Sequence, residues 1–148
     1  MLDAITSLLG DFDLSKFIPD IDTALGKFEL AARICVMLGP LVLLGLGLWY
    51  LLAPPNEMGS RVGFHTFRRA KTQEVWEYTQ HLAGIVWGAM GVVLTIVMAL
   101  ICNGYRGLNA LQVATSAVIC ILVELILLTA SIIAINVIVS KAFYKKEN

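Results

Sequence analysis

Three long apolar runs constrain this chain more than any other feature of its sequence. They cover about residues 30–53, 82–102 and 111–139, and each reaches the roughly 20 mostly apolar residues that a helix needs to cross a bilayer. Only 15% of all residues are charged, whereas soluble domains have about a quarter. In hydrocarbon, every backbone polar group needs an internal partner, so each run is expected to be a helix. The sequence therefore predicts an all-α integral membrane protein with three transmembrane helices.

Residues 1–29 form an acidic segment ahead of the first run. Apolar side chains recur at helical spacing on both sides of Pro19, which predicts one or two amphipathic helices at the membrane surface or against the spans. A partly disordered tail is the alternative. The segment lacks a basic n-region and a small-residue cleavage site, so no removable signal peptide is expected. Its acids outnumber its bases: Asp3, Asp11, Asp13, Asp20, Asp22 and Glu29 against Lys16 and Lys27.

The distribution of basic residues predicts the orientation of the chain. With three crossings, the first loop (residues 54–81) and the C-terminus lie on the same side. Basic clusters lie in this loop, at residues 61–71, and near the C-terminus, at residues 141–146, whereas the second loop holds only Arg106. The positive-inside rule therefore predicts a cytoplasmic loop and C-terminus and an outer N-terminus.

The stretch 61–87 joins the basic loop to the second run. Thr72 suits a helix N-cap, and Glu74 follows in the first turn, where the helix dipole favours an anion. The helix is then expected to continue without a break into the membrane. Four of its side chains fall within one narrow arc, because eleven residues make close to three turns. They are Trp76, Gln80, Ala83 and Trp87.

The same stretch resembles the motif of the SdpI family, bacterial membrane proteins named for an immunity factor against a secreted toxic peptide. That motif is approximately G-[YF]-R-T-P, a polar K-N pair, W-x-[FY]-A-[NH] and G-K-x-W, between two spans. Gln80 stands where the family has Asn or His. The matching positions are Arg61, Gly63, Phe64, Thr66, Lys71, Trp76, Tyr78, Gly84 and Trp87.

The resemblance covers the span arrangement over about residues 41–140 and corresponds to the SdpI-like half of longer family members. It implies a multi-pass protein of the bacterial cytoplasmic membrane, divided here into the acidic segment 1–29 and a membrane domain 30–148. It also implies a non-enzymatic role, immunity or resistance to a membrane-active toxic peptide. The motif residues are then candidate contacts for a ligand or for lipid headgroups.

Two other functions are consistent with the basic loop and with an intramembrane acid. The protein can be a structural or regulatory adaptor whose loop recruits a partner protein or anionic lipid headgroups, because the guanidinium group of arginine binds phosphate well. The same charges can instead only fix topology. A small transporter that uses Glu124 is a third possibility, and three spans would then require an oligomer.

Glu124 lies near the middle of the third run and has no basic neighbour in sequence. A carboxyl group at that depth is expected to be neutral or hydrogen-bonded inside the bundle. Ala117, Glu124 and Ser131 are seven residues apart, which predicts one common face turned toward the other helices. Glu124 can belong to a proton or cation relay, or it can fix packing through an interhelical hydrogen bond.

Gly84, Gly88 and Gly91 belong to a stripe of small residues that contains GxxxG. In lipid such a stripe lets two backbones approach closely. The partner is either another helix of the same chain or a second copy in a homo-oligomer.

Several kinds of site are not expected. His65 and His81 lack partners at metal-ligand spacing, and the three cysteines lie in or beside apolar runs, where they suit small apolar packing residues. No phosphate-binding loop, nucleophile elbow or dinucleotide motif is present, so neither catalysis nor a cofactor is expected. Nucleic acid is not an expected partner, because the basic residues are few and close to the membrane.

Overall fold

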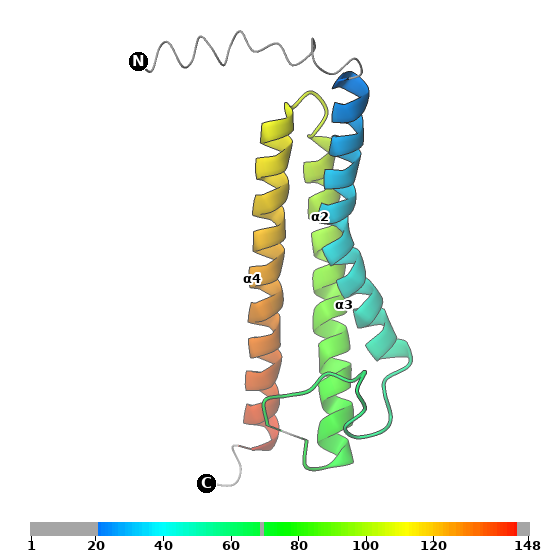
Figure 1. Ribbon diagram of the computed structural model, residues 1–148. Coiled ribbons are helices and arrows are strands. Elements are labelled where there is room, and N and C mark those ends of the chain that lie inside the picture. The colour runs from blue at the N-terminus through cyan, green and yellow to red at the C-terminus, as the bar shows by residue number, and fades with distance from the viewer. Residues whose placement is uncertain (1–20, 69, 145–148) are drawn as a thin grey trace, which may run out of the picture.

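The fold is described by a computed structural model for residues 21–68 and 70–144. Three long antiparallel helices make up this part of the chain: α2 (Ile21–Leu52), α3 (Gln73–Asn103) and α4 (Ala110–Phe143) (Figure 1). It contains no strand, and all three helices are long and apolar enough to cross a membrane. The predicted all-α fold with three spans is confirmed. The amphipathic helices expected within residues 1–20 lie outside the described residues.

Helix α2 begins earlier than the sequence suggested. It starts at Ile21 instead of at about residue 30, so residues 21–29 belong to the same helix as the first span. Gly26 is the residue with the lowest helix propensity in this part, and a single glycine costs a helix only about 1 kcal/mol. An ion pair between Glu29 and Arg33, one turn apart, also joins the two parts.

Local capping explains where the other two helices begin. The Thr72 hydroxyl accepts a hydrogen bond from the Val75 N–H (3.4 Å), as the sequence predicted for an N-cap. Asn109 and Gln112 form a reciprocal capping box at the start of α4. Helix α4 ends at Phe143, about one turn beyond the expected end of its span.

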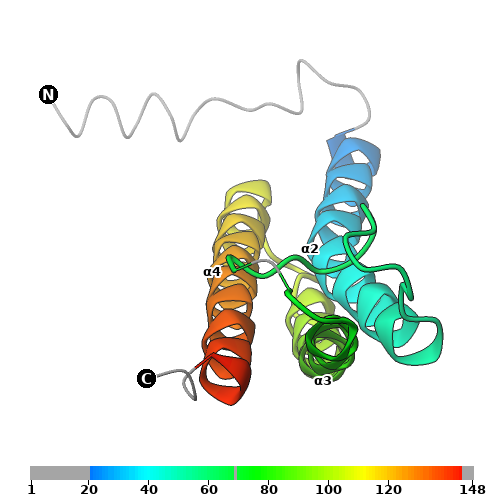
Figure 2. The same ribbon diagram turned by 90° about the horizontal axis from the view of Figure 1, so that it is seen from below.

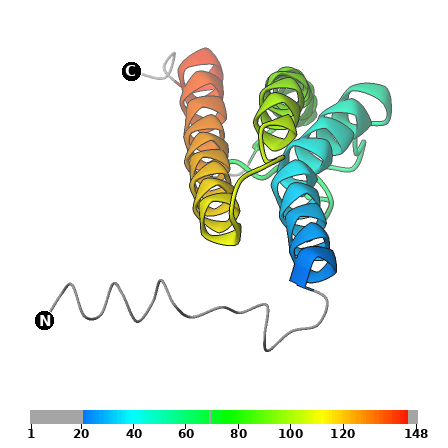
Figure 3. The same cartoon turned by 90° about the horizontal axis from the view of Figure 1, so that it is seen from above.

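Helix α2 changes direction along its length. Pro40 is buried inside it and has no N–H to donate to the preceding turn, which commonly kinks a helix. In Figures 1 and 3 the later, cyan-to-teal half of α2 leans away from α4. The first loop, which ends where α3 begins at Gln73 and not at residue 81, runs across this end of the bundle from α2 to α4 and back to α3, as the view from below shows (Figure 2). The loop and the end of α4 therefore lie at the same end, as the topology predicts.

The glycine stripe of α3 packs against α2. A Cβ atom on Gly47 of α2 would lie 2.3 Å from the backbone nitrogen of Gly88, and one on Gly91 would lie 2.5 Å from the nitrogen of Leu44. A Cβ atom on Gly84 would lie 2.9 Å from the Leu51 side chain. Within the described part of the chain, these small residues therefore allow α2 and α3 to pack closely against each other.

Large apolar side chains cover the outside of the bundle. One example from each helix is Leu52 in α2 (82% exposed), Leu100 in α3 (69%) and Leu111 in α4 (76%). Water-soluble monomers rarely expose continuous apolar surface of this kind. It suits the hydrocarbon of a bilayer, which is the environment of this protein.

Candidate functional site

The side-chain amide of Gln80 connects the first loop to helix α3. Its Oε1 accepts a hydrogen bond from the Phe64 N–H (2.8 Å), and its Nε2 donates to the Phe64 carbonyl oxygen (2.9 Å). Gln80 is fully buried. One amide thus pairs with both backbone groups of a single loop residue, as a neighbouring strand would. This contact fixes the position of Phe64 inside the end of the bundle.

Further hydrogen bonds attach the loop to all three helices. The Tyr50 hydroxyl of α2 donates to the Val62 carbonyl (2.9 Å), and the Trp76 indole of α3 donates to the Pro55 carbonyl (2.7 Å). From α4, the Asn136 Oδ1 accepts from the Phe67 N–H (2.7 Å). These side chains satisfy backbone groups that have no partner within the loop itself. The loop is therefore an integral part of the fold.

Aromatic rings fill the space under the loop. Phe64 meets Trp87 edge-to-face, with ring centroids 5.3 Å apart, and the Tyr50 ring lies 5.8 Å from Trp87. The Trp87 indole donates to the Ser131 hydroxyl of α4 (3.1 Å). Gly63 lies flat against Trp76, because a Cβ atom there would come within 2.4 Å of the indole ring. The glycine at this motif position is thus explained by a close approach.

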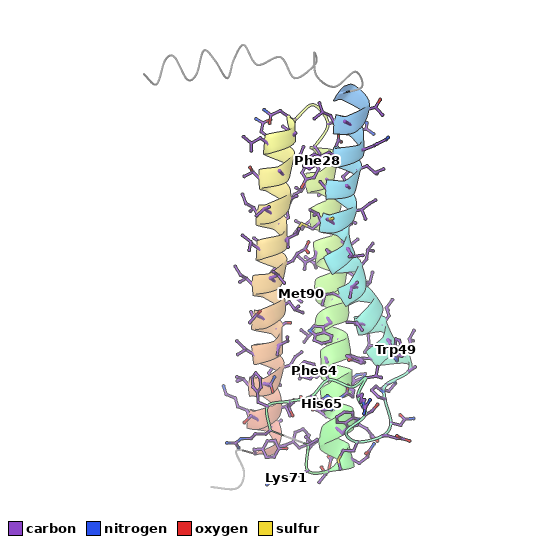
Figure 4. The ribbon with its side chains drawn as sticks, in the orientation of Figure 1. Phe28, Trp49, Phe64, His65, Lys71 and Met90 are labelled. Carbon is purple, nitrogen blue, oxygen red and sulfur yellow. The ribbon has the colours of Figure 1, made fainter. Side chains whose placement is uncertain are left out.

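A cavity of about 590 Å³ lies between the loop and the start of α3. Its volume is in the range of small-molecule sites. The His65 ring lies beside Trp76 at its wall (centroids 5.4 Å apart), and Figure 4 shows Phe64 and His65 at this end of the bundle. The cavity is lined by Met58, Gly59, Phe64, His65, Thr66, Phe67, Ala70, Trp76 and Thr79.

The motif residues do not all meet in this cavity. Arg61 is exposed and has no hydrogen bond or ion pair with the described residues. The Thr66 hydroxyl donates to the Arg68 carbonyl and so braces the loop locally. Lys71 lies outside the cavity, over the Tyr144 ring. Tyr78 also lies elsewhere, with its ring centroid 5.2 Å from that of Phe143 of α4.

The predicted arc of α3 faces the loop and the bundle interior. Trp76, Gln80, Ala83 and Trp87 are all buried. Sequence reasoning selected Trp76, Gln80 and Trp87 as candidate contacts of a ligand. In the structure their polar atoms form hydrogen bonds with Pro55, Phe64 and Ser131, and Trp76 also lines the cavity.

Glu124 faces helix α2 near the middle of the bundle. A Cβ atom on Gly39 would lie 2.3 Å from the Glu124 Oε2, so the glycine leaves room for the carboxyl group. The carboxyl Oε1 is buried and has no hydrogen-bond partner among the described residues. Ala117, Glu124 and Ser131 are all buried, as their spacing predicts.

Two residues of the loop attachment were missed by the sequence analysis, Tyr50 and Asn136. Each is a hydrogen-bonding side chain near the loop end of its helix. Their position along the helices was the available signal, because each residue lies near the end of the bundle that the first loop crosses. No group of three or more metal-ligating side chains occurs within residues 21–68 and 70–144, where Cys35, Cys102 and Cys120 are all free.

Comparison with known proteins assigns the chain to a family. Residues 54–138 match the SdpI/YfhL protein family, which covers more than half of the chain. No match is found among curated proteins or among solved structures. The matched region contains the whole first loop and α3, together with most of α4. The protein therefore belongs to the SdpI/YfhL family of membrane proteins.

Proposed function

We propose that this protein protects a bacterial cell against a membrane-active toxic peptide, without catalysing a reaction. It would act in the cytoplasmic membrane, with the first loop and the C-terminus inside the cell. The observation that carries the proposal is the family match over residues 54–138, which includes the docked loop. The immunity role is the one implied by the resemblance to the SdpI motif.

The way in which the loop is held supports a binding role. Its attachments use the amides of Gln80 and Asn136, the indole of Trp76 and the phenol of Tyr50. None of these groups changes its charge near neutral pH in its ordinary state. A rigid scaffold of this kind suits recognition of a ligand better than proton transfer.

The surface of the bundle offers a place for a peptide within the bilayer. Its exposed apolar side chains can pack against an inserted helix as well as against lipid. The acidic residues of the first thirty positions would attract a cationic peptide to the outer face. The docked loop would keep the helices in place while the peptide binds.

A peptide-challenge assay tests this function. Cells with and without the gene are exposed to a panel of membrane-active peptides, and survival is counted. We expect protection against at least one peptide, lost in Gln80→Met and retained in Gln112→Met, which makes the same change at an exposed helix cap. Both variants are checked for equal amounts in the membrane. Equal survival with and without the gene across the panel contradicts the proposal.

The orientation is tested separately by labelling. Ser60→Cys, in a chain whose three native cysteines are replaced, is treated with a membrane-impermeant thiol reagent. We expect no labelling in intact cells and labelling after permeabilisation. Labelling from outside intact cells would reverse the proposed topology.

A membrane adaptor is the second candidate, and the exposed loop surface favours it. Phe67 is 79% exposed and Arg61 is also exposed, so both remain available to a cytoplasmic partner. Recovery of a partner with the wild-type protein, lost in Arg61→Ala and Phe67→Ala but retained in Arg106→Ala, would support this role. Recovery of the same partner with all variants would contradict it.

A further inference from the structure

A second hollow lies on the other side of Phe67, between the loop and α4. It has a volume of about 240 Å³ and is mainly apolar. Ile133 and Val137, one turn apart on α4, form part of its wall and are 51% and 44% exposed, so the hollow opens toward the bilayer. Arg68 and Tyr144 line its other end. We call this hollow the α4 groove.

Two cationic side chains gather at the end of the α4 groove. The Arg68 guanidinium carbon and the Lys71 ammonium nitrogen each lie 5.8 Å from the centroid of the Tyr144 ring. In Figure 4, Lys71 lies at the end of the molecule where the loop meets α3. Lys141 is in the last turn of α4, at the same end. A negatively charged group is therefore favoured here.

An apolar wall that ends in two cations at the edge of the membrane matches the chemistry of an anionic phospholipid. We propose that the α4 groove binds one such lipid, with its phosphate at Arg68 and Lys71 and one acyl chain along Ile133 and Val137. The forked guanidinium of arginine suits phosphate oxygens. Arg61, the basic residue that the motif emphasised, does not line this groove. The inference does not depend on the immunity role.

The bound lipid would also support the docked loop. Phe67 and Asn136 both line the α4 groove, and their hydrogen bond joins the loop to α4. A lipid in the groove shields this bond from water. Lipid composition would thus influence how firmly the loop is held.

Lipid retention measured by native mass spectrometry tests the proposal. The full chain is purified in detergent and mixed with phosphatidylglycerol or with phosphatidylcholine of the same acyl chains. We expect one retained phosphatidylglycerol and no comparable retention of phosphatidylcholine. Arg68→Gln and Lys71→Gln should each weaken retention about fivefold, the usual effect of one basic residue beside an anionic headgroup. Arg106→Gln, in the other loop, should have no effect.

A second pair of variants tests the acyl-chain part of the site. Val137→Trp should fill the groove and reduce retention, whereas Ile126→Trp, on the same helix but outside the groove, should not. Equal retention of the two lipids by the wild type, or full retention in Arg68→Gln, Lys71→Gln and Val137→Trp, would overturn the proposal. If free glycerol phosphate displaces phosphatidylglycerol at equal concentration, the acyl chain contributes nothing and a lipid site is excluded.

Discussion

Replacing Gln80 with methionine should undock the first loop without changing the volume of the side chain greatly. Methionine has a similar length but cannot form either hydrogen bond to Phe64. The N–H and the carbonyl of Phe64 would then be left without partners beneath the loop. Each unsatisfied buried group costs about 1–3 kcal/mol, so with two such groups we expect a loss of about 2–6 kcal/mol in the free energy of unfolding.

Equilibrium unfolding in mixed micelles with increasing dodecyl sulfate measures this loss. Gln112→Met is the matched control, because Gln112 is exposed and takes part only in a helix cap, where a loss of about 1 kcal/mol is usual. Hydrogen exchange gives a local readout, since the Phe64 amide should exchange faster in Gln80→Met. If Gln80→Met is no less stable than Gln112→Met and the Phe64 amide stays protected, the loop is not held by this amide.

Three further changes follow from contacts elsewhere in the bundle. Gly47→Ala should destabilise the α2–α3 contact by about 1–3 kcal/mol through overpacking, whereas Gly45→Ala, with open space around it, should be neutral or stabilising in the same unfolding assay. Glu124→Gln should keep full protection in the peptide challenge; a loss of protection at equal membrane amounts would support a titrating role for Glu124. Burial raises the pKa of the Tyr105 phenol in the second loop, so the folded state holds this proton more tightly than the unfolded chain does. Stability should therefore be lost as the pH rises above about 10. Tyr105→Phe should reduce that loss when the free energy of unfolding is measured below and above about pH 10.

Features encoded locally could be predicted from the sequence. The start of α3 follows from one hydroxyl at Thr72, and the buried face of α4 follows from the spacing of Glu124 and Ser131. The three spans follow from apolar length alone. The start of α2 was the exception, because the apolar run begins at about residue 30 whereas the helix already begins at Ile21, within the acidic segment.

The loop attachments could not be predicted, because they depend on contacts between residues far apart in the chain. Phe67 and Asn136 are 69 positions apart, and no local pattern links them. Sequence reasoning also treated Gln80 and Trp76 as possible ligand contacts, since a polar group in a motif is usually assigned to a ligand first. Their partners are backbone atoms of the loop, which a pattern of side chains does not reveal.

The hydrogen bond from Phe67 to Asn136 has a consequence for biogenesis. The loop leaves the ribosome before α4 has been synthesised, so it cannot reach its final position until the third helix has entered the membrane. Until then the Phe67 N–H has no partner in the chain and depends on water, whereas the contacts of the loop with α2 and α3 can already form. Attachment of the loop to α4 is thus a late step of assembly, and it marks a chain whose third helix is in place.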